Sequence, residues 1–229
     1  MFARNPRAQA GLLCGQPFFL TVENRKEVAL MAQNPIFPAY VDISGRYFSK
    51  PGRENTKNIL DAVARRAEEL CIGKVLVATC TGRTAVEARK VLASSIKVLA
   101  VTHVTGFEKP NFQELSAANR RKLESLGVPI LTCQHAFGGV GRGIRRKLAT
   151  YQVDEIIAYT LRTFGQGTKV AIELALMAAD AGLVRTDEDV ISIGGTVEGA
   201  DAALVLQPAN SSNFFDLKVR EVIAKPRNF

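Results

Sequence analysis

Apolar residues recur at two different spacings along this chain, and the two spacings alternate from about residue 40 onward. Short apolar runs predict strands at residues 40–43, 75–78, 97–101, 128–131, 190–193 and 203–206. Segments with apolar residues every three or four positions predict helices at 55–70, 84–92, 116–126, 142–148, 153–163 and 168–181. This alternation predicts an α/β fold with a mostly parallel sheet sandwiched by helices, whose ligand site lies outside the carboxyl ends of the strands.

The first 35 residues differ from the rest of the chain in their pattern of apolar and charged residues. They show no clear period and carry no acidic residue before Glu23, and glycines at 11 and 15 interrupt the apolar run that a secretory signal would need. We interpret residues 1–35 as an N-terminal extension that is disordered, is an organelle transit peptide, or precedes the true start of the protein at Met31. Residues 36–229 form the predicted α/β domain.

Composition narrows the class of protein. Hydrophobic residues make up 47% and charged residues 23%, as in soluble globular proteins, and no window approaches the roughly 20 apolar residues of a membrane span. The four cysteines are scattered without a CxxC pair, which favours a reducing compartment. We therefore expect a cytoplasmic protein, or an imported one if the first residues are a transit peptide, with no membrane partner.

The net charge of +8 does not by itself indicate a nucleic-acid partner. Most basic residues are interspersed with acidic ones along predicted helices, which is typical of solvated helix faces. The densest basic cluster is Arg142, Arg145, Arg146 and Lys147, and it lacks the interleaved aromatic residues of a single-strand binder. Nucleic acid is thus a disfavoured partner, and the sequence leaves a homo-oligomer open.

The segment Lys74–Ala85, KVLVATCTGRTA, has the composition of an anion cradle. An apolar strand runs into hydroxyls, a glycine and an arginine just before a helix, where backbone N–H groups lack partners and carry partial positive charge. An ordinary strand-to-helix turn with a Ser/Thr cap is the alternative interpretation. The residues that we predict to bind phosphate in this segment are Thr79, Cys80, Thr81, Gly82, Arg83 and Thr84.

Polar residues also follow the other predicted strands. The two histidines of the chain, His103 and His135, each come just after a strand, so they are expected to meet at one edge of the sheet. A hydrogen-bonded structural histidine is the alternative for each of them. The further ligand-binding residues predicted at these strand ends are Thr102, His103, Thr132, His135, Gly194, Gly195, Thr196, Gly199 and Asp201.

Two cysteines lie near these strand ends. Cys80, at a helix start, could have a lowered pKa and be reactive, but we favour a small residue that fills a tight turn. His103, His135, Cys80 and Cys133 could in principle ligate a metal, yet their spacing matches no zinc pattern and no carboxylate joins them. No metal is therefore predicted.

With these loops in view, the chain resembles the C-terminal alpha/beta domain of pyruvate kinase. TCTGRTA at residues 79–85 is similar to the TKSGRSA loop that wraps one phosphate of the sugar bisphosphate activator, and LAVTH at 99–103 is similar to IAVTR. The stretch 189–208 is similar to the effector loop and its flanking strands. The resemblance implies the three-layer architecture of that domain over roughly residues 55–208. The catalytic barrel of pyruvate kinase has no counterpart in these 229 residues, so we expect no pyruvate kinase activity.

The chain looks still more like a small family of stand-alone proteins that share this domain. The phrases KPGRENT, THVTGF, LTCQHAFGGVGRGI and IGGTVEGADAALVLQP are similar to that family's signatures, over about residues 47–226. Members are associated with flavin mononucleotide (FMN), which implies a phosphate-bearing ligand here too. The loop Gly194–Asp201, however, lacks the arginine and tryptophan of the pyruvate kinase effector loop and carries Glu198 and Asp201, whose charge disfavours a second phosphate.

The sequence thus predicts a protein that binds a phosphorylated small molecule, with FMN as the cofactor that the resemblance suggests. Thr79–Thr84 would hold the phosphate, and the loop Gly194–Asp201 with the two histidines would face the body of the ligand. The alternative is an enzyme in the same pocket, either a flavin-dependent oxidoreductase or a phosphosugar isomerase, that uses His103 or His135 as acid or base. Which of the two the protein is, the sequence leaves open.

Overall fold

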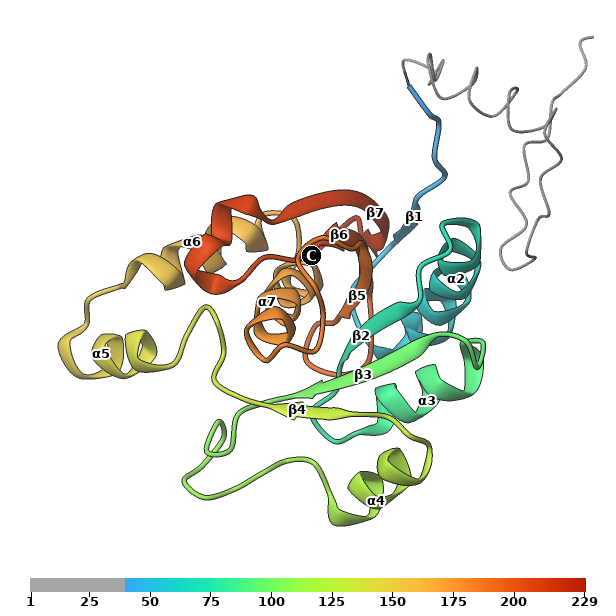
Figure 1. The fold of residues 1–229 in the computed structure, drawn as a ribbon. Helices are drawn as coiled ribbons and strands as arrows, with labels where there is room; N and C mark the ends of the chain where they lie inside the picture. The colour runs from blue at the N-terminus through green and yellow to red at the C-terminus, as the bar shows by residue number, and fades with distance from the viewer. Residues whose placement is uncertain (1–39) are drawn as a thin grey trace, which may run out of the picture. The chain divides into compact units, whose positions relative to one another are not determined.

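The computed structural model describes residues 40–229 (Figure 1). Residues 44–229 form one compact unit, and residues 40–43 belong to a separate N-terminal unit. The predictions for residues 1–35, including a start at Met31, lie outside the described residues. The predicted strand at 40–43 is absent: this stretch forms no regular element, and the first strand, β1, spans Arg46–Phe48.

A single seven-stranded sheet forms the centre of the compact unit. Its spatial order is β1-β7-β6-β5-β2-β3-β4. After β1, the strands along the chain are β2 (Lys74–Ala78), β3 (Lys97–Thr102), β4 (Ile130–Thr132), β5 (Val190–Gly194), β6 (Ala202–Gln207) and β7 (Lys218–Pro226). β2, β3, β4 and β5 pair in parallel, whereas β6 is antiparallel to both β5 and β7. The sheet is therefore mostly parallel, as the sequence predicts, and its parallel part gathers the ends of β2 to β5 at one edge.

Helices cover both faces of the sheet (Figure 1). One face carries α2 (Thr56–Glu69), α3 (Arg83–Val91) and α4 (Ala117–Ser125). The other carries α7 (Gln166–Asp180), with α6 (Val153–Arg162) packed against it; α5 (Val140–Leu148) precedes α6. Two short 3-10 helices lie at Arg53–Asn55 and Ser211–Asp216. This three-layer arrangement is the α/β architecture expected from the alternating pattern.

The alternation of side chains along each strand explains why both faces need covering. In β2, Val75 and Val77 pack into the core under α2 and α3, whereas Leu76 between them packs into the core under α7. All three side chains are fully buried. Because β2 is apolar on both faces, it can only be a central strand with a helical layer on each side.

The last strand, β7, is absent from the sequence-based prediction. Its first three residues are exposed and its sequence, KVREVIAKP, alternates charged and apolar residues only in part. Such a pattern carries little signal, because the strand needs to bury only part of one face against the helix beside it. It pairs in antiparallel fashion with β6 and in parallel with β1, and so builds the side of the sheet away from the candidate site.

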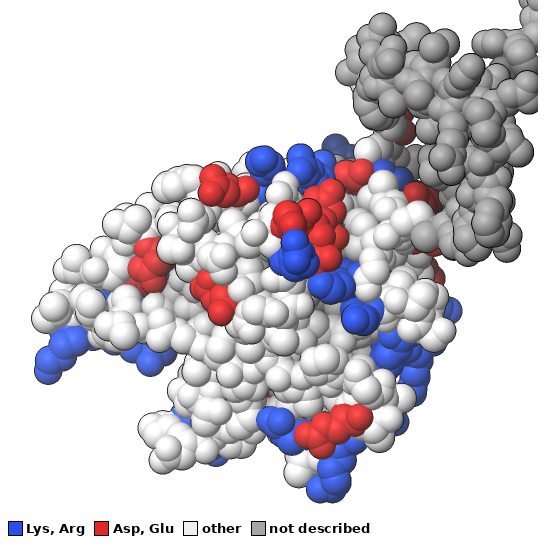
Figure 2. Space-filling view, viewed as in Figure 1, with Lys and Arg blue, Asp and Glu red and all other residues white. Residues whose placement is uncertain are grey.

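Among residues 40–229, no helix is long and apolar enough to cross a membrane. On the face drawn in Figure 2, acidic and basic side chains lie interspersed over the described residues. This agrees with the expectation that the excess of basic residues mostly decorates solvated helix faces.

Candidate functional site

The loop between β2 and α3 forms one wall of a crevice at the carboxyl edge of the sheet. Gly82 precedes α3 with φ 93°, and an added Cβ would lie 2.7 Å from a methyl carbon of Leu115. Only glycine fits both the backbone and the space. The Asn119 side chain also holds the loop, because its Nδ2 donates a 2.7 Å hydrogen bond to the carbonyl of Thr81. Gly82 thus shapes the loop and packs against α4; it does not line the crevice.

This wall has features that suit an anion. No side chain caps the N-terminus of α3, so the N–H groups of its first turn are free of a side-chain acceptor. Thr79 is 5% exposed, and its Oγ1 is buried without any hydrogen-bond partner in the structure. Buried hydroxyls are nearly always paired, and Thr79 lines the crevice, so its hydroxyl is a candidate hydrogen-bonding group for a ligand bound there.

The loop between β5 and β6 forms the opposite wall. Buried Asp201 braces it, because its Oδ2 accepts hydrogen bonds from the backbone N–H of Gly52 at 3.0 Å and of Thr196 at 3.2 Å. Burial raises the pKa of Asp201. At the tip, Val197 has φ 63° and a side chain that is 93% exposed. A β-branched residue rarely adopts this conformation, and such strain is common at ligand-binding loops.

An ion-pair bridge joins the two walls. Glu198, from the β5–β6 loop, lies 2.9 Å from Nη2 of Arg83 and 3.7 Å from Nη1 of Arg53. The predicted phosphate-binding arginine is therefore paired with a carboxylate of its own chain. The charge of Glu198, which the sequence suggested would repel a second phosphate, is in this structure offset by two guanidinium groups.

The walls enclose a cavity of about 600 Å³, and a second one of about 130 Å³ adjoins it between β3 and α7. The predicted residues that line the larger cavity are Thr79, Cys80, Thr81, Arg83, Thr84, His103, Gly195, Thr196 and Gly199. Thr102 and His135 line the smaller one. Gly82, Thr132, Gly194 and Asp201 line neither of them.

Three of these four serve packing or support, and the part played by Gly82 is described above. Gly194 lets β5 and α7 cross closely, since an added Cβ would lie 2.0 Å from the carbonyl oxygen of Gly167. Asp201 braces the β5–β6 loop as described above. Thr132 is exposed, and its hydroxyl shares a 2.7 Å hydrogen bond with that of Thr102. These residues shape the crevice from behind, which a pattern of strand ends does not distinguish from lining it.

The structure adds residues that the strand-end pattern missed. Those that line the two cavities come from other loops and helices: Arg53, Thr56, Glu87, Phe107, Glu114, Arg142, Arg162, Gln166, Lys169, Val170 and Glu173. Little in the sequence indicated that Phe107 and Glu114 belong to the site, because they lie in a long polar loop after β3. The α7 residues were partly signalled, because the glycines before that helix place its start near an anion site.

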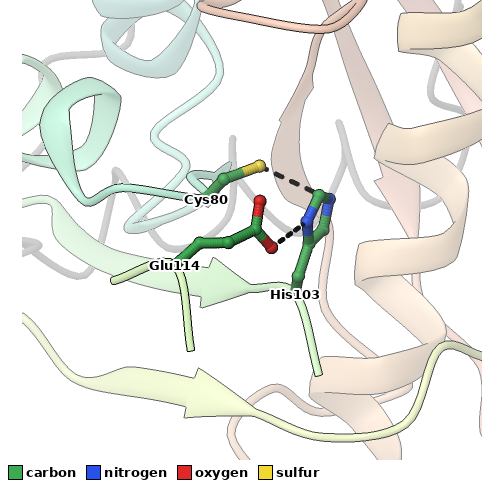
Figure 3. Close-up of side chains that lie close together, drawn as sticks. All are labelled: Cys80, His103 and Glu114. Carbon is green, nitrogen blue, oxygen red and sulfur yellow. Dashed lines mark hydrogen bonds and ion pairs between the residues drawn. The ribbon is translucent and has the colours of Figure 1, made fainter. Parts of the chain in front are cut away.

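At the rim of the crevice, three side chains form a chain of hydrogen bonds (Figure 3). Sγ of Cys80 lies 3.4 Å from Nε2 of His103, and Nδ1 of His103 lies 2.6 Å from Oε2 of Glu114. An ionised carboxylate can only accept, so Nδ1 donates to Glu114, and in the neutral imidazole Nε2 then accepts from the thiol. The Phe107 ring, 4.1 Å from that of His103 between centroids, packs against the imidazole.

The pKa of Cys80 departs from the expectation for a helix start. Burial, with the charge of Glu114 as a smaller contribution, raises it to about 11. The thiol is therefore protonated at neutral pH, and the lowered pKa considered from the sequence is wrong. Potential metal-ligating atoms of Cys80, His103 and Glu114 do lie within 4.8 Å of one another, so a carboxylate joins the histidine after all.

Deeper in the crevice, α7 supplies a buried ionic network. Glu173 accepts hydrogen bonds from Nζ of Lys169 at 2.5 Å and from the backbone N–H of Phe137 at 2.9 Å. Nδ1 of His135 lies 3.7 Å from the same carboxylate, and Nε2 of His135 is buried without a hydrogen-bond partner in the part of the chain that the structure describes. Burial alone would raise the pKa of Glu173, but the His135 ring and the Lys169 charge outweigh it and lower the pKa to about 2.

The basic cluster of α5 also faces inward in part. Arg142 lies over the ring of Phe107 at 4.9 Å and lines the smaller cavity. Arg145 donates a 2.7 Å hydrogen bond to buried Glu155 of α6. Arg142 and Arg145 of this cluster are thus each engaged in a contact within the chain.

Two comparisons with known proteins bear on the family of this chain. The family model for the pyruvate kinase alpha/beta domain matches residues 57–206, more than half of the chain. Among solved structures, Cryptosporidium parvum pyruvate kinase in complex with ADP matches with 16% identity and a TM-score of 0.32, covering 86% of this chain. This chain spans 27% of the length of that protein. From the family match, the chain belongs to the pyruvate kinase alpha/beta domain family.

Proposed function

We propose that this protein binds a phosphorylated small molecule in the crevice between the β2–α3 loop and the β5–β6 loop. The observation that carries the proposal is the orphan hydroxyl of Thr79, which is 5% exposed and borders both cavities. It lies in the loop that leads to the uncapped N-terminus of α3 and to Arg83. Hydroxyl, backbone N–H and guanidinium donors gathered in one loop suit the oxygens of a phosphate.

The size of the crevice supports an organic ligand. A volume of about 600 Å³ falls within the range of small-molecule sites. The rings of His103, Phe107 and His135 lie within 5.4 Å of one another between centroids and offer a partly aromatic surface to the body of the ligand. FMN, which the resemblance suggests, has both a phosphate and a flat ring system and is therefore the first organic ligand to test.

The test compares three single variants by calorimetric titration with inorganic phosphate and by quenching of FMN fluorescence. Thr79→Val removes the orphan hydroxyl at nearly constant volume, and Arg83→Gln removes the guanidinium. We expect each to weaken phosphate binding by about tenfold or more, as for the loss of a hydrogen bond to a charged group. Arg185→Gln is the control, since Arg185 lies before β5, at the opposite edge of the sheet, and pairs with Asp187 on the surface.

The stability of Thr79→Val makes the test sharper. Because Oγ1 of Thr79 has no hydrogen-bond partner among residues 40–229, its removal should leave the midpoint of urea unfolding unchanged or raise it. A loss of phosphate binding at full stability therefore assigns the hydroxyl to the ligand. Unchanged binding of phosphate and FMN in both Thr79→Val and Arg83→Gln, or no binding by the unmodified protein, would falsify the proposal.

A further inference from the structure

We propose that Cys80 is a nucleophile, with His103 as its general base and Glu114 as the residue that positions His103, and that its substrate class is an acyl phosphate. The inference rests on the proposed function for the phosphate half of the substrate. Its starting observation is that thiol, imidazole and carboxylate form one continuous hydrogen-bonded chain at the wall of the larger cavity (Figure 3). A nucleophile beside a base that a third group orients is the general pattern of covalent catalysis.

The order of atoms favours a proton relay over a metal centre. His103 stands between its two partners, with Nε2 toward the sulfur and Nδ1 toward the carboxylate. A single ion cannot use both nitrogens of one imidazole, so a metal bound with Cys80 at Nε2 would leave Glu114 outside its ligand shell. The observed hydrogen bonds instead orient the lone pair of Nε2 at the thiol, as a general base requires.

The raised pKa of Cys80 decides how such a thiol would react. A resting thiolate is disfavoured by burial and by the nearby Glu114 carboxylate. The proton must therefore leave during the attack itself, to Nε2 of His103, and the Glu114 carboxylate offsets the positive charge that then forms on the imidazole. Proton transfer of this kind accelerates reactions by about 10² to 10⁴-fold.

The position of Cys80 limits the substrate. It stands one residue after Thr79 and three before Arg83, so sulfur and predicted phosphate site belong to the same short loop. The electrophilic carbon must consequently lie close to the phosphate of the same molecule. An acyl phosphate meets this condition because a single oxygen joins its carbonyl carbon to phosphorus, and phosphate is also a good leaving group.

The reaction balances without an outside oxidant or reductant. The sulfur of Cys80 forms a bond to the carbonyl carbon while its proton passes to Nε2 of His103, and the carbonyl π electrons move to oxygen. When the carbonyl re-forms, the bond between carbon and the phosphate oxygen breaks, and Nε2 returns the proton to the departing phosphate. The products are a thioester on Cys80 and inorganic phosphate. Water, deprotonated by His103, then cleaves the thioester to a carboxylic acid and the thiol.

The first experiment measures nucleophilicity without any phosphate. Intact protein is labelled with iodoacetamide, and mass spectrometry of peptides follows Cys80 and Cys133 in the same sample. Cys133 is the internal control, because it is a partly buried thiol whose pKa burial also raises. We expect His103→Gln to slow labelling of Cys80 by about 10²-fold and Glu114→Gln by about tenfold, with no change at Cys133. Equal rates at Cys80 in the unmodified protein and in His103→Gln would overturn the assignment.

The pH profile separates a relay from a structural hydrogen bond. With His103 as base, the labelling rate at Cys80 should level off at alkaline pH, whereas in His103→Gln it should keep rising about tenfold per pH unit, as expected for a simple thiol of high pKa. Protection of Cys80 by one equivalent of zinc, lost in His103→Gln, would instead identify a metal site and overturn the proposal.

The second experiment separates this inference from the proposed function. Inorganic phosphate should slow the labelling of Cys80; if it does not while the dependence on His103 persists, the phosphate site is wrong and the nucleophile stands. Acetyl phosphate should then yield an acetyl thioester on Cys80, with a mass gain on that peptide alone that disappears in Cys80→Ser. If phosphate protects Cys80 but acetyl phosphate leaves no thioester and is not hydrolysed, the acyl-phosphate substrate is wrong.

Discussion

Two histidine–glutamate pairs line the crevice, and they differ in distance, in exposure and in the groups that each pair contacts. His103 and Glu114 meet at the rim at 2.6 Å, with side chains 29% and 21% exposed. His135 and Glu173 stand 3.7 Å apart in the interior, with side chains 13% and 4% exposed. The rim pair continues outward to a thiol at the cavity wall, whereas the interior pair continues inward to Lys169 and the backbone of Phe137.

The surroundings of Glu173 and Glu114, and not their residue type, distinguish a structural carboxylate from one that could take part in a reaction. Glu173 is held by several donors and is part of the packing between α7 and the segment after β4. Buried charges of this kind must be paired, and they are costly to disturb. Glu114 has one ring nitrogen as its partner and a route to solvent, so its charge is available to a reaction. Both histidines looked equally suitable as acid or base in the sequence.

We expect the largest effect from a substitution that breaks the interior pair of His135 and Glu173. Glu173→Gln leaves the ammonium of Lys169, which is 4% exposed, without its counter-ion. We expect the free energy of unfolding at pH 7 to fall by about 3 to 5 kcal/mol, as when one partner of a buried ion pair is removed. Urea unfolding followed by circular dichroism measures it. The matched control is Glu114→Gln at the rim, where solvent screens the pair and the loss should stay within about 1 kcal/mol.

Equal destabilisation by the two substitutions would show that the rim pair also supports the fold, and the contrast between the pairs would then fail. Lys169→Met in the Glu173→Gln background tests the cause. Removing the unpaired ammonium as well should restore part of the lost stability, because an apolar side chain of similar length fits the same space.

A smaller effect appears in acid. The pKa of Glu173 in the folded protein is about 2, below its ordinary value of 4.5, so the folded state binds fewer protons than the unfolded state between these values. The stabilisation from ionised Glu173 is therefore complete above about pH 4.5 and is lost as the pH falls toward 2. In urea unfolding at a series of pH values, the stability difference between the unmodified protein and Glu173→Gln should shrink across this window.

A difference that stays constant from pH 5 to pH 2 would contradict the assignment, because it would mean that the Glu173 carboxylate is not the group that titrates. Glu114→Gln again serves as the control, since its stability difference is expected to be small at every pH.

The smallest effect concerns the ion-pair bridge over the crevice. Glu198 forms an ion pair with Arg83, which we propose as a phosphate ligand. An incoming phosphate must therefore displace this carboxylate. Glu198→Gln should raise the affinity for inorganic phosphate by about twofold to fivefold, in line with the modest strength of an exposed ion pair. Calorimetric titration at constant ionic strength measures it.

Glu87 supplies the matched control, because it lines the same cavity and forms no ion pair with an arginine among residues 40–229. If Glu87→Gln strengthens phosphate binding as much as Glu198→Gln does, the gain comes from the overall charge of the crevice, and competition at Arg83 is excluded.

Much of the fold follows from local pattern. The apolar runs of β2, β3, β5 and β6 are strong because these strands bury most of their residues. The helical spacing is clear in α2, which buries one face, and in α7, which buries most of its residues. The weak elements were misplaced for the same reason. β1 and β7 lie at one side of the sheet; β1 contains no buried residue and the first three residues of β7 are exposed, so the prediction placed one too early and omitted the other.

For the site, the sequence by itself determined which strand ends carry polar chemistry, because the carboxyl ends of parallel strands must share an edge. It also predicted the turn with a glycine and hydroxyl side chains before α3, because the preference of these residues for such a turn depends only on their neighbours in sequence. Only the tertiary structure decided which of these residues line the crevice and which support it, as with Asp201 and Gly194.

The same limit applies to the chain of Cys80, His103 and Glu114. Its members are 23 and 11 residues apart in sequence, and the last lies in a polar loop with no periodic pattern. A hydrogen bond depends on distances of a few tenths of an ångström and on direction, which residue types and spacing do not encode. The sequence could place a thiol, an imidazole and a carboxylate in one protein, but folding of the loop after β3 joins them into one hydrogen-bonded chain.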